Sequence, residues 1–167
     1  YTILAKKGVV FSIMDGYIKE EERIQKFIKN SLFENYMIKF SSTEINIDKY
    51  IDTLNTSLNL INNSKDALIE LEKPTHRVIF IDVYKQNKKA IIKVKDNAGG
   101  IPKDIIDKVC EPYFTTKHQS QGTGIGLYMT SQIIKKNMNG TFKIENVEVK
   151  YENKIYKGIE TTIEVSI

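Results

Sequence analysis

The sequence predicts an α+β fold: a two-layer α/β sandwich in which helices cover one face of a mixed, mostly antiparallel sheet. Two observations predict it. Apolar residues recur at three- and four-residue spacing over long stretches, which is typical of helices with one buried face. Shorter apolar segments come in pairs separated by polar turns, which indicates antiparallel hairpins.

Composition indicates one soluble globular domain of ordinary size, with length enough for a short extension. Of the 167 residues, 41% are hydrophobic and 28% charged, which allows a sizeable core. The net charge of +4 is too small and too dispersed along the chain to favour nucleic acid as a partner. The one cysteine, Cys110, excludes an internal disulfide and favours a reducing, cytoplasmic location. No apolar run is long enough to span a bilayer, so we expect no membrane contact by this segment.

The first part of the chain is expected to form an N-terminal extension, residues 1–45, before a main domain over residues 46–167. Apolar residues at helical spacing predict a helix over 17–40, packed either on the core or on a partner chain. The polar residues 41–43 interrupt that pattern.

The next elements are a helix and a hairpin. Helical spacing continues from about 48 to 71, and Pro74 marks the end of that helix. Strands are predicted over 77–84 and 89–95, joined by the polar turn at 86–88.

The C-terminal part begins with an irregular segment, residues 101–121, whose length is typical of a functional loop. A third helix is predicted over 125–138. A final hairpin of two strands, near 141–151 and 159–167, is expected around the turn Asn153-Lys154.

A glycine-rich segment, Gly122-Thr-Gly-Ile-Gly126-Leu, lies where that loop becomes a helix. Glycine allows positive φ and close approach of N–H groups to a ligand, and N–H groups at a helix start favour an anion. The segment is therefore a candidate phosphate cradle.

Two asparagines, Asn59 and Asn63, are one turn apart on the predicted helix over 48–71, so they share a face. Their amide oxygens are hard, neutral ligands suited to Mg²⁺. The alternative is a polar outer face in an asparagine-rich chain.

Asp96 ends a predicted strand and precedes glycines. An ionised carboxylate there accepts hydrogen bonds only, which suits the exocyclic amine of adenine and disfavours the carbonyl of guanine. The alternative is a turn-forming aspartate.

Residues 111–117, Glu-Pro-Tyr-Phe-Thr-Thr-Lys, combine aromatic and polar side chains inside the long loop. They predict a flexible lid with a hydrophobic latch, in which Lys117 could reach a phosphate. The alternative is a surface loop with buried aromatic anchors.

These four segments together resemble the catalytic ATP-binding domain of bacterial sensor histidine kinases. Asn59…Asn63, Asp96-x-Ala-x-Gly100, residues 111–117 and residues 122–127 resemble that family's N box, first glycine box, F box and second glycine box, in order. The resemblance covers residues 55–130 and fits the closing strands, and it does not extend to residues 1–45. It implies a Bergerat-type ATP-binding fold with an ATP lid.

By this resemblance, Asn63 would coordinate Mg²⁺ with help from Asn59, Asp96 would bind the adenine amino group, and Lys117 would steady the nucleotide. The amides from Gly122 to Leu127 would wrap the phosphates. The other residues expected at the nucleotide are Asp66, Ala98, Gly100, Ile101, Phe114, Thr116, Thr123, Gly124, Ile125, Gly126 and Thr161.

The implied activity is transfer of the γ-phosphoryl group of ATP to a histidine. His76 and His118 lack a surrounding acceptor helix, so the acceptor would lie on a separate dimerisation domain of the same parent chain or of a dimer mate, and through it the domain would serve a response regulator. The chain itself is expected to be monomeric, as the cytoplasmic part of a sensor that is itself either soluble or membrane-bound. Cys110 is interpreted as a buried anchor of the lid.

Two alternatives stay open at this point. One is an ATP-hydrolysing clamp of the same superfamily, which places a glutamate base where this chain has Asn59; an amide cannot take a proton at neutral pH. The other is a nucleotide-binding regulatory module without transfer activity.

Overall fold

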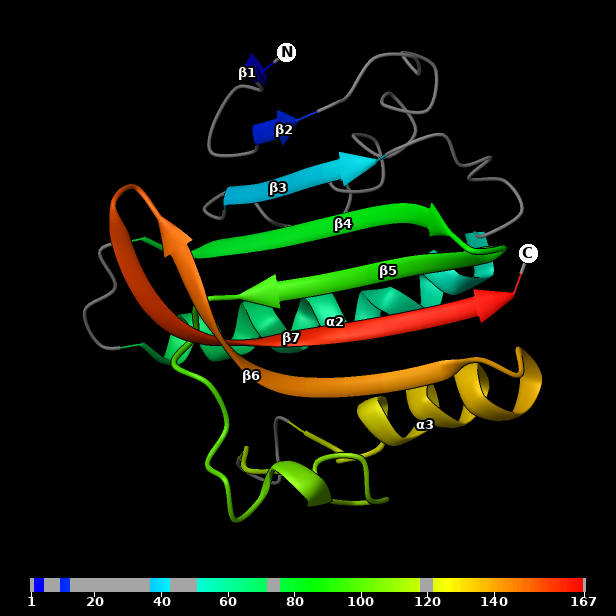
Figure 1. Ribbon diagram of the computed structural model, residues 1–167. Helices are drawn as coiled ribbons and strands as arrows, with labels where there is room; N and C mark the ends of the chain where they lie inside the picture. The colour runs from blue at the N-terminus through cyan, green and yellow to red at the C-terminus, as the bar shows by residue number, and fades with distance from the viewer. Residues whose placement is uncertain are drawn as a thin grey trace.

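The computed structural model describes residues 2–4, 10–12, 37–42, 51–71, 76–117 and 122–166 (Figure 1). Within these residues, one sheet has the strand order β1-β2-β3-β4-β5-β7-β6. The strands are β1 (Thr2–Leu4), β2 (Val10–Ser12), β3 (Met37–Ser42), β4 (Val78–Gln86), β5 (Lys89–Asp96), β6 (Thr141–Tyr151) and β7 (Lys154–Ser166). The helical segments are α2 (Ile51–Glu70), the 3-10 turn η2 (Ile106–Lys108), α3 (Gly126–Gln132) and the π-helical turn η3 (Ile133–Asn137).

The predicted α+β class is confirmed. Helices α2 and α3 lie on one face of the sheet (Figure 1). Strand β3 pairs in parallel with β2 and with β4, and the other neighbouring strands pair antiparallel. The sheet is therefore mixed and mostly antiparallel.

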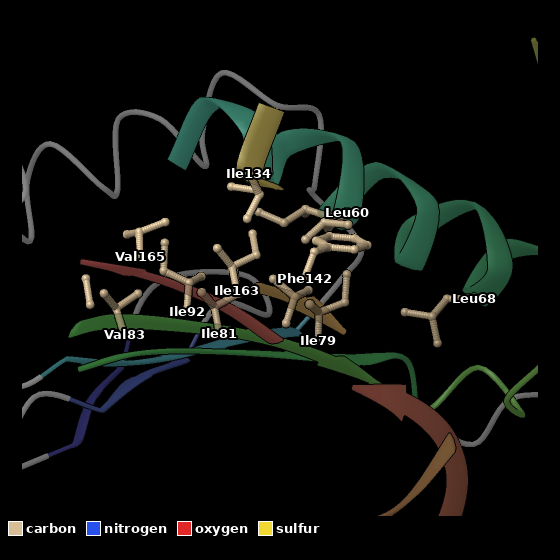
Figure 2. Close-up of a cluster of buried hydrophobic side chains, with 13 residues drawn as sticks. Leu60, Leu68, Ile79, Ile81, Val83, Ile92, Ile134, Phe142, Ile163 and Val165 are labelled. Carbon is tan, nitrogen blue, oxygen red and sulfur yellow. The ribbon is translucent and has the colours of Figure 1, made fainter. Parts of the chain in front are cut away.

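The core lies between the sheet and the helices (Figure 2). Alternate residues of β4 point toward the helices, because side chains on a strand alternate between its two faces. Leu60 and Leu68 of α2 meet them, and Ile134 of η3 adds to the same cluster. Each such side chain contributes about 1.5–3 kcal/mol when fully buried.

Both long hairpins close with two-residue turns. Asn87 and Lys88 have φ of 49° and 60°, and Glu152 and Asn153 have φ of 44° and 60°. Positive φ at both central residues gives the turn a twist that matches the strands beside it. The turn at 152–153 lets β7 begin at Lys154, paired with Tyr151, whereas the sequence predicted a start near residue 159.

Two helix predictions are corrected. The predicted helix over 17–40 is wrong over its last four residues, because Met37–Ser42 form β3; residues 17–36 lie outside the described part of the chain. Ile38 and Phe40 occupy the register of Ile79 and Ile81, so an alternating pattern paired with β4 prevails over helical spacing.

The predicted helix over 125–138 is α-helical only as far as Gln132, and η3 continues it. The N–H of Met138 donates to the Ile133 carbonyl at 3.1 Å, and that of Gly140 donates to Ile134 at 2.8 Å. These longer-range bonds close the helix before β6 begins.

Candidate functional site

Asp96 is the last residue of β5, and its side chain lies in the layer between sheet and helices although it carries a carboxyl group. Only 1% of its surface is exposed. The Ser64 hydroxyl donates to Oδ2 at 2.7 Å and the Ala98 N–H donates to Oδ1 at 3.0 Å. The Ile159 N–H of β7 also bonds to this carboxyl group. The carboxylate is thus held from α2, from the following loop and from β7.

Burial raises the pKa of the Asp96 carboxyl, and the hydrogen bonds from Ser64, Ala98 and Ile159 act in the opposite direction. The three donors all favour the ionised form, which accepts hydrogen bonds and donates none. A buried acceptor of this kind suits recognition of an N–H group on a ligand.

Three residues around Asp96 were missed by the sequence reasoning: Ser64, Asn97 and Gly158. Asn97 is 3% exposed; its Oδ1 accepts from the Val78 N–H at 2.9 Å and its Nδ2 donates to the His76 carbonyl at 3.1 Å. It therefore ties the end of β5 to the start of β4. No pattern in the sequence pointed to this role, since asparagine is also common in turns.

Gly158 of β7 lies directly against the main-chain carbonyl of Asp96, where a Cβ atom would not fit. Beside it, the Gly99 N–H donates to the Lys157 carbonyl at 2.9 Å. A glycine inside a strand pattern indicates a close backbone approach, and this signal could have identified Gly158.

At Gly100 and Ile101 the chain passes from this site into the long loop. Gly100 has φ of 86°, and the Asn146 side chain of β6 pairs with both backbone groups of Ile101, at 2.7 and 2.8 Å. Thr161 is 3% exposed and lies opposite Val94, two residues before Asp96 on the same face of β5. Ala98 packs against the core. The residues predicted at the base, Asp96, Ala98, Gly100 and Thr161, are therefore gathered around the end of β5 and the middle of β7.

The other candidate residues gather around α2, the loop and α3. Asn59 Nδ2 lies 3.4 Å from Thr130 Oγ1 of α3, and a Cβ on Gly126 would lie 4.0 Å from Asn59 Cγ. Asn63 is half-buried one turn along. The predicted metal ligands of α2 thus lie on the stretch of helix that packs on α3.

Lys117 of the loop reaches α2. Its Nζ lies 2.7 Å from Asp66 Oδ2, with side chains 23% and 39% exposed. Asp66 is three residues after Asn63, so the two side chains project from neighbouring positions of the helix. The ion pair holds the end of the loop beside the predicted metal ligands.

The glycines of the 122–127 segment pack on the loop. Gly124 has φ of 64°, and its missing side chain is replaced by the backbone of Tyr113 and Phe114. A Cβ on Gly122 would lie 2.9 Å from Thr115 Oγ1. Small size is therefore required here by packing as well as by any close approach of a ligand.

The remaining residues predicted at the nucleotide differ in their surroundings. Phe114 and Ile125 are half-buried, Leu127 packs against the core, and Thr116 and Thr123 are exposed.

Cys110 is partly buried against the core cluster, as expected of a loop anchor, and burial raises the pKa of its thiol. A raised pKa disfavours the thiolate, and the thiolate is the form that acts as a nucleophile. Cys110 is therefore poorly suited to that role. His76 contacts Tyr156 Oη at 3.1 Å and Glu152 Oε2 at 3.1 Å. His118 lies outside the described residues.

Within the described ranges, no three His, Cys, Asp or Glu side chains gather as a metal site. A cation at this site would therefore depend on amide oxygens such as those of Asn59 and Asn63, which fit Mg²⁺. None of the described helices is long and apolar enough to cross a membrane.

Fold and site together define a nucleotide-binding ATPase-type domain, and comparison with known proteins identifies its family. Residues 54–167 match the family described as histidine kinase-, DNA gyrase B- and HSP90-like ATPases. Because the match covers more than half of the chain, the chain belongs to this family.

The relatives of this chain include a sensor kinase and a sporulation kinase. The sensor kinase CckA of Brucella abortus is 34% identical over 90 residues, which cover 48% of this chain and 10% of that protein. Sporulation kinase C of Bacillus subtilis is 33% identical over 89 residues, which cover 53% of this chain and 19% of the kinase. The chain thus spans at most about a fifth of the length of these relatives.

Solved structures with the same fold include the nucleotide-free catalytic domain of histidine kinase ThkA. That likeness has a TM-score of 0.56 and 25% identity, and it covers 90% of this chain and 86% of the other. The mycobacterial sensor histidine kinase MprB shares the fold with a TM-score of 0.55 at 18% identity, over 89% of each chain.

Proposed function

We propose that residues 46–167 bind Mg-ATP and transfer its γ-phosphoryl group to a histidine on a separate dimerisation domain, in two-component signal transduction in the cytoplasm. The observation that carries the proposal is the Asp96 carboxylate, buried at the end of β5 and held by three hydrogen-bond donors. The membership of the histidine kinase-like ATPase family and the names of the relatives support it.

In this proposal Asp96 accepts a hydrogen bond from the adenine amine. The candidate residues of α2, of the loop and of the glycine segment before α3 bind the phosphates. Asn63 and Asn59 would hold Mg²⁺, which would neutralise phosphate charge and supply electrostatic stabilisation during transfer. Lys117 would exchange Asp66 for a phosphate oxygen. These assignments put the base and the phosphates beside the same turn of α2, because Ser64 at the base directly follows Asn63.

The chemical step would form a nitrogen–phosphorus bond on the acceptor imidazole while the bond from the γ-phosphorus to the bridging oxygen breaks. ADP leaves with the electron pair of the broken bond, and the second ring nitrogen releases its proton to water. Neutral imidazole is a nucleophile near pH 7 and needs little activation. The domain therefore supplies position and charge neutralisation, without a base of its own.

One observation weighs against the hydrolase alternative. Asn59 stands where a hydrolase of this superfamily has a glutamate base, and its Nδ2 faces the Thr130 hydroxyl. An amide in that place cannot deprotonate water. The regulatory-module alternative predicts the same nucleotide contacts, so only an activity measurement separates it from a kinase.

The test is incubation with γ-labelled ATP and a candidate acceptor domain. Label in an acid-labile, base-stable linkage on the acceptor would support the kinase. ADP with free phosphate and no labelled acceptor would favour the hydrolase. Bound but unreacted ATP with every candidate acceptor would favour the regulatory module and refute the proposed transfer.

A further inference from the structure

The hydroxyl group of Ser64 occupies an unusual place for a polar side chain. It lies on α2 directly after Asn63, is 3% exposed, and donates to Asp96 Oδ2 at 2.7 Å across the helix–sheet interface. The sequence reasoning assigned it no role.

The groups that face Asp96 come from each neighbouring element. Besides Ser64 of α2, they are the N–H of Ala98 from the loop and the N–H of Ile159 from β7; Ile79 of β4 lies opposite in register. The three donors are uncharged, and two of them are backbone groups. Ser64 is therefore the one side-chain donor among them, and a substitution can remove it without altering the backbone.

We infer that Ser64 is a positioning residue that sets base specificity: its hydroxyl donates to Asp96 Oδ2 and fixes the orientation of the carboxyl group toward the base. An ionised Asp96 accepts from an exocyclic amine, as on adenine, and repels the carbonyl that guanine presents. A protonated Asp96 would offer an O–H donor, which a guanine carbonyl accepts. The inference rests on the proposed function, since it concerns the same nucleotide site.

The balance of forces at Asp96 supports this role. Burial raises the pKa of the carboxyl, and the Ser64 hydroxyl is the largest of the effects that lower it. Because a hydrogen bond to a charged group is strong, removing this donor is expected to raise the pKa of Asp96 further. The protonated fraction would then grow at a given pH.

The experiment measures ADP and GDP binding without Mg²⁺ by calorimetry across the acidic and neutral range. It compares the parent chain with Ser64→Ala, and with Ser131→Ala as a matched control that removes a buried hydroxyl from α3 (Ser131 is 2% exposed). For Ser64→Ala we expect the acid limb of ADP binding to move up by about one pH unit. We also expect the preference for ADP over GDP to fall about tenfold at the acid end of the range.

Each nucleotide titrates identically with all three proteins, so differences between the pH profiles for one nucleotide come from the protein. An affinity loss in Ser64→Ala that is equal at every pH and for both nucleotides would show a merely structural role and overturn the inference. Should Ser64→Ala fail to fold, Ser64→Cys replaces it, since a thiol has similar size and is a weaker donor. An unshifted acid limb in that variant would also overturn the inference.

Failure of the proposed function gives a different result. A parent chain that binds neither ADP nor GDP would refute nucleotide binding itself and the inference with it. A parent chain that binds ADP, beside a Ser64→Ala variant with an unchanged profile, would refute the inference alone.

Discussion

The backbone of Gly158 in β7 lies directly against the main-chain carbonyl of Asp96 in β5, with no space between them for a side chain. The strands can approach this closely only because residue 158 has no Cβ. The carboxylate at the base site is therefore positioned partly by a glycine 62 residues away in the sequence.

Gly158→Ala is expected to lower the free energy of unfolding by about 3 kcal/mol, because the new methyl group must push β7 away from β5. Urea unfolding measures this. Gly126→Ala is the control for stability, since its Cβ would meet no atom closer than 4.0 Å. Equal stability of the two variants would show that the close approach is absent.

Asp96→Asn is expected to change how stability depends on pH. The pKa of Asp96 is raised in the folded state, chiefly by burial, so its stabilising contribution is complete below its unfolded pKa near 3.8 and is lost as pH rises through the folded pKa. The asparagine variant lacks this loss. The difference between the free energy of unfolding of the variant and that of the parent chain should therefore shift in favour of the variant as pH increases.

The same variant should bind ADP at least about tenfold more weakly, because its amide can turn a donor toward the adenine amine. Calorimetry at neutral pH measures the affinity. Unchanged ADP affinity would refute base recognition by Asp96, and a stability difference that does not vary with pH would refute the raised pKa.

Asn63→Ala is expected to weaken Mg-ATP binding severely and to leave the fold intact. Asn63 is only half-buried, so its removal costs little packing, whereas a Mg²⁺ ligand would be lost. Calorimetry with and without Mg²⁺ provides the measurement, and the circular dichroism spectrum checks the fold. Parent-like Mg-ATP affinity would disprove the metal assignment.

Lys117→Ala is expected to reduce ATP affinity about tenfold and to leave adenosine affinity unchanged, because the ammonium group is predicted to contact phosphate and not the base. Its effect on stability should stay below about 1 kcal/mol, because both members of the Lys117–Asp66 pair are partly exposed. An equal loss for adenosine and ATP would contradict a phosphate contact.

Local signals were sufficient for much of the fold. The hairpin β4–β5 was predicted within a few residues because its strands have apolar stretches and its turn is polar. The helix around Asn59 and Asn63 was predicted as well, since helical spacing and Pro74 delimit it. The segment Met37–Ser42 was misread, because the helical stripe that ends at Tyr36 was extended to residue 40. The alternate spacing of Ile38 and Phe40 suits a strand, and pairing with β4 realises it.

The residues of the candidate site also differ in whether local sequence patterns indicate them. Asp96, Asn63 and the glycines of 122–127 stand in recognisable local patterns, and their roles at the nucleotide stay predictions. Ser64 and Asn97 act through neighbours far away in the chain, so no local pattern reveals them. Gly158 also acts on a distant residue, but a glycine within a strand is a local signal of close backbone approach. The pairing of Lys117 with Asp66 likewise joins residues 51 positions apart.

The amino-acid sequence by itself determined the fold class, the family to which the chain belongs, and the order of the segments that carry its polar side chains. Only the tertiary structure decided which donors surround Asp96, how near β7 approaches it, and which α2 carboxylate Lys117 meets. The physical reason is that periodicity and turn chemistry act between near neighbours in the chain, whereas burial and hydrogen bonding of a buried carboxylate depend on strands and helices brought together by folding.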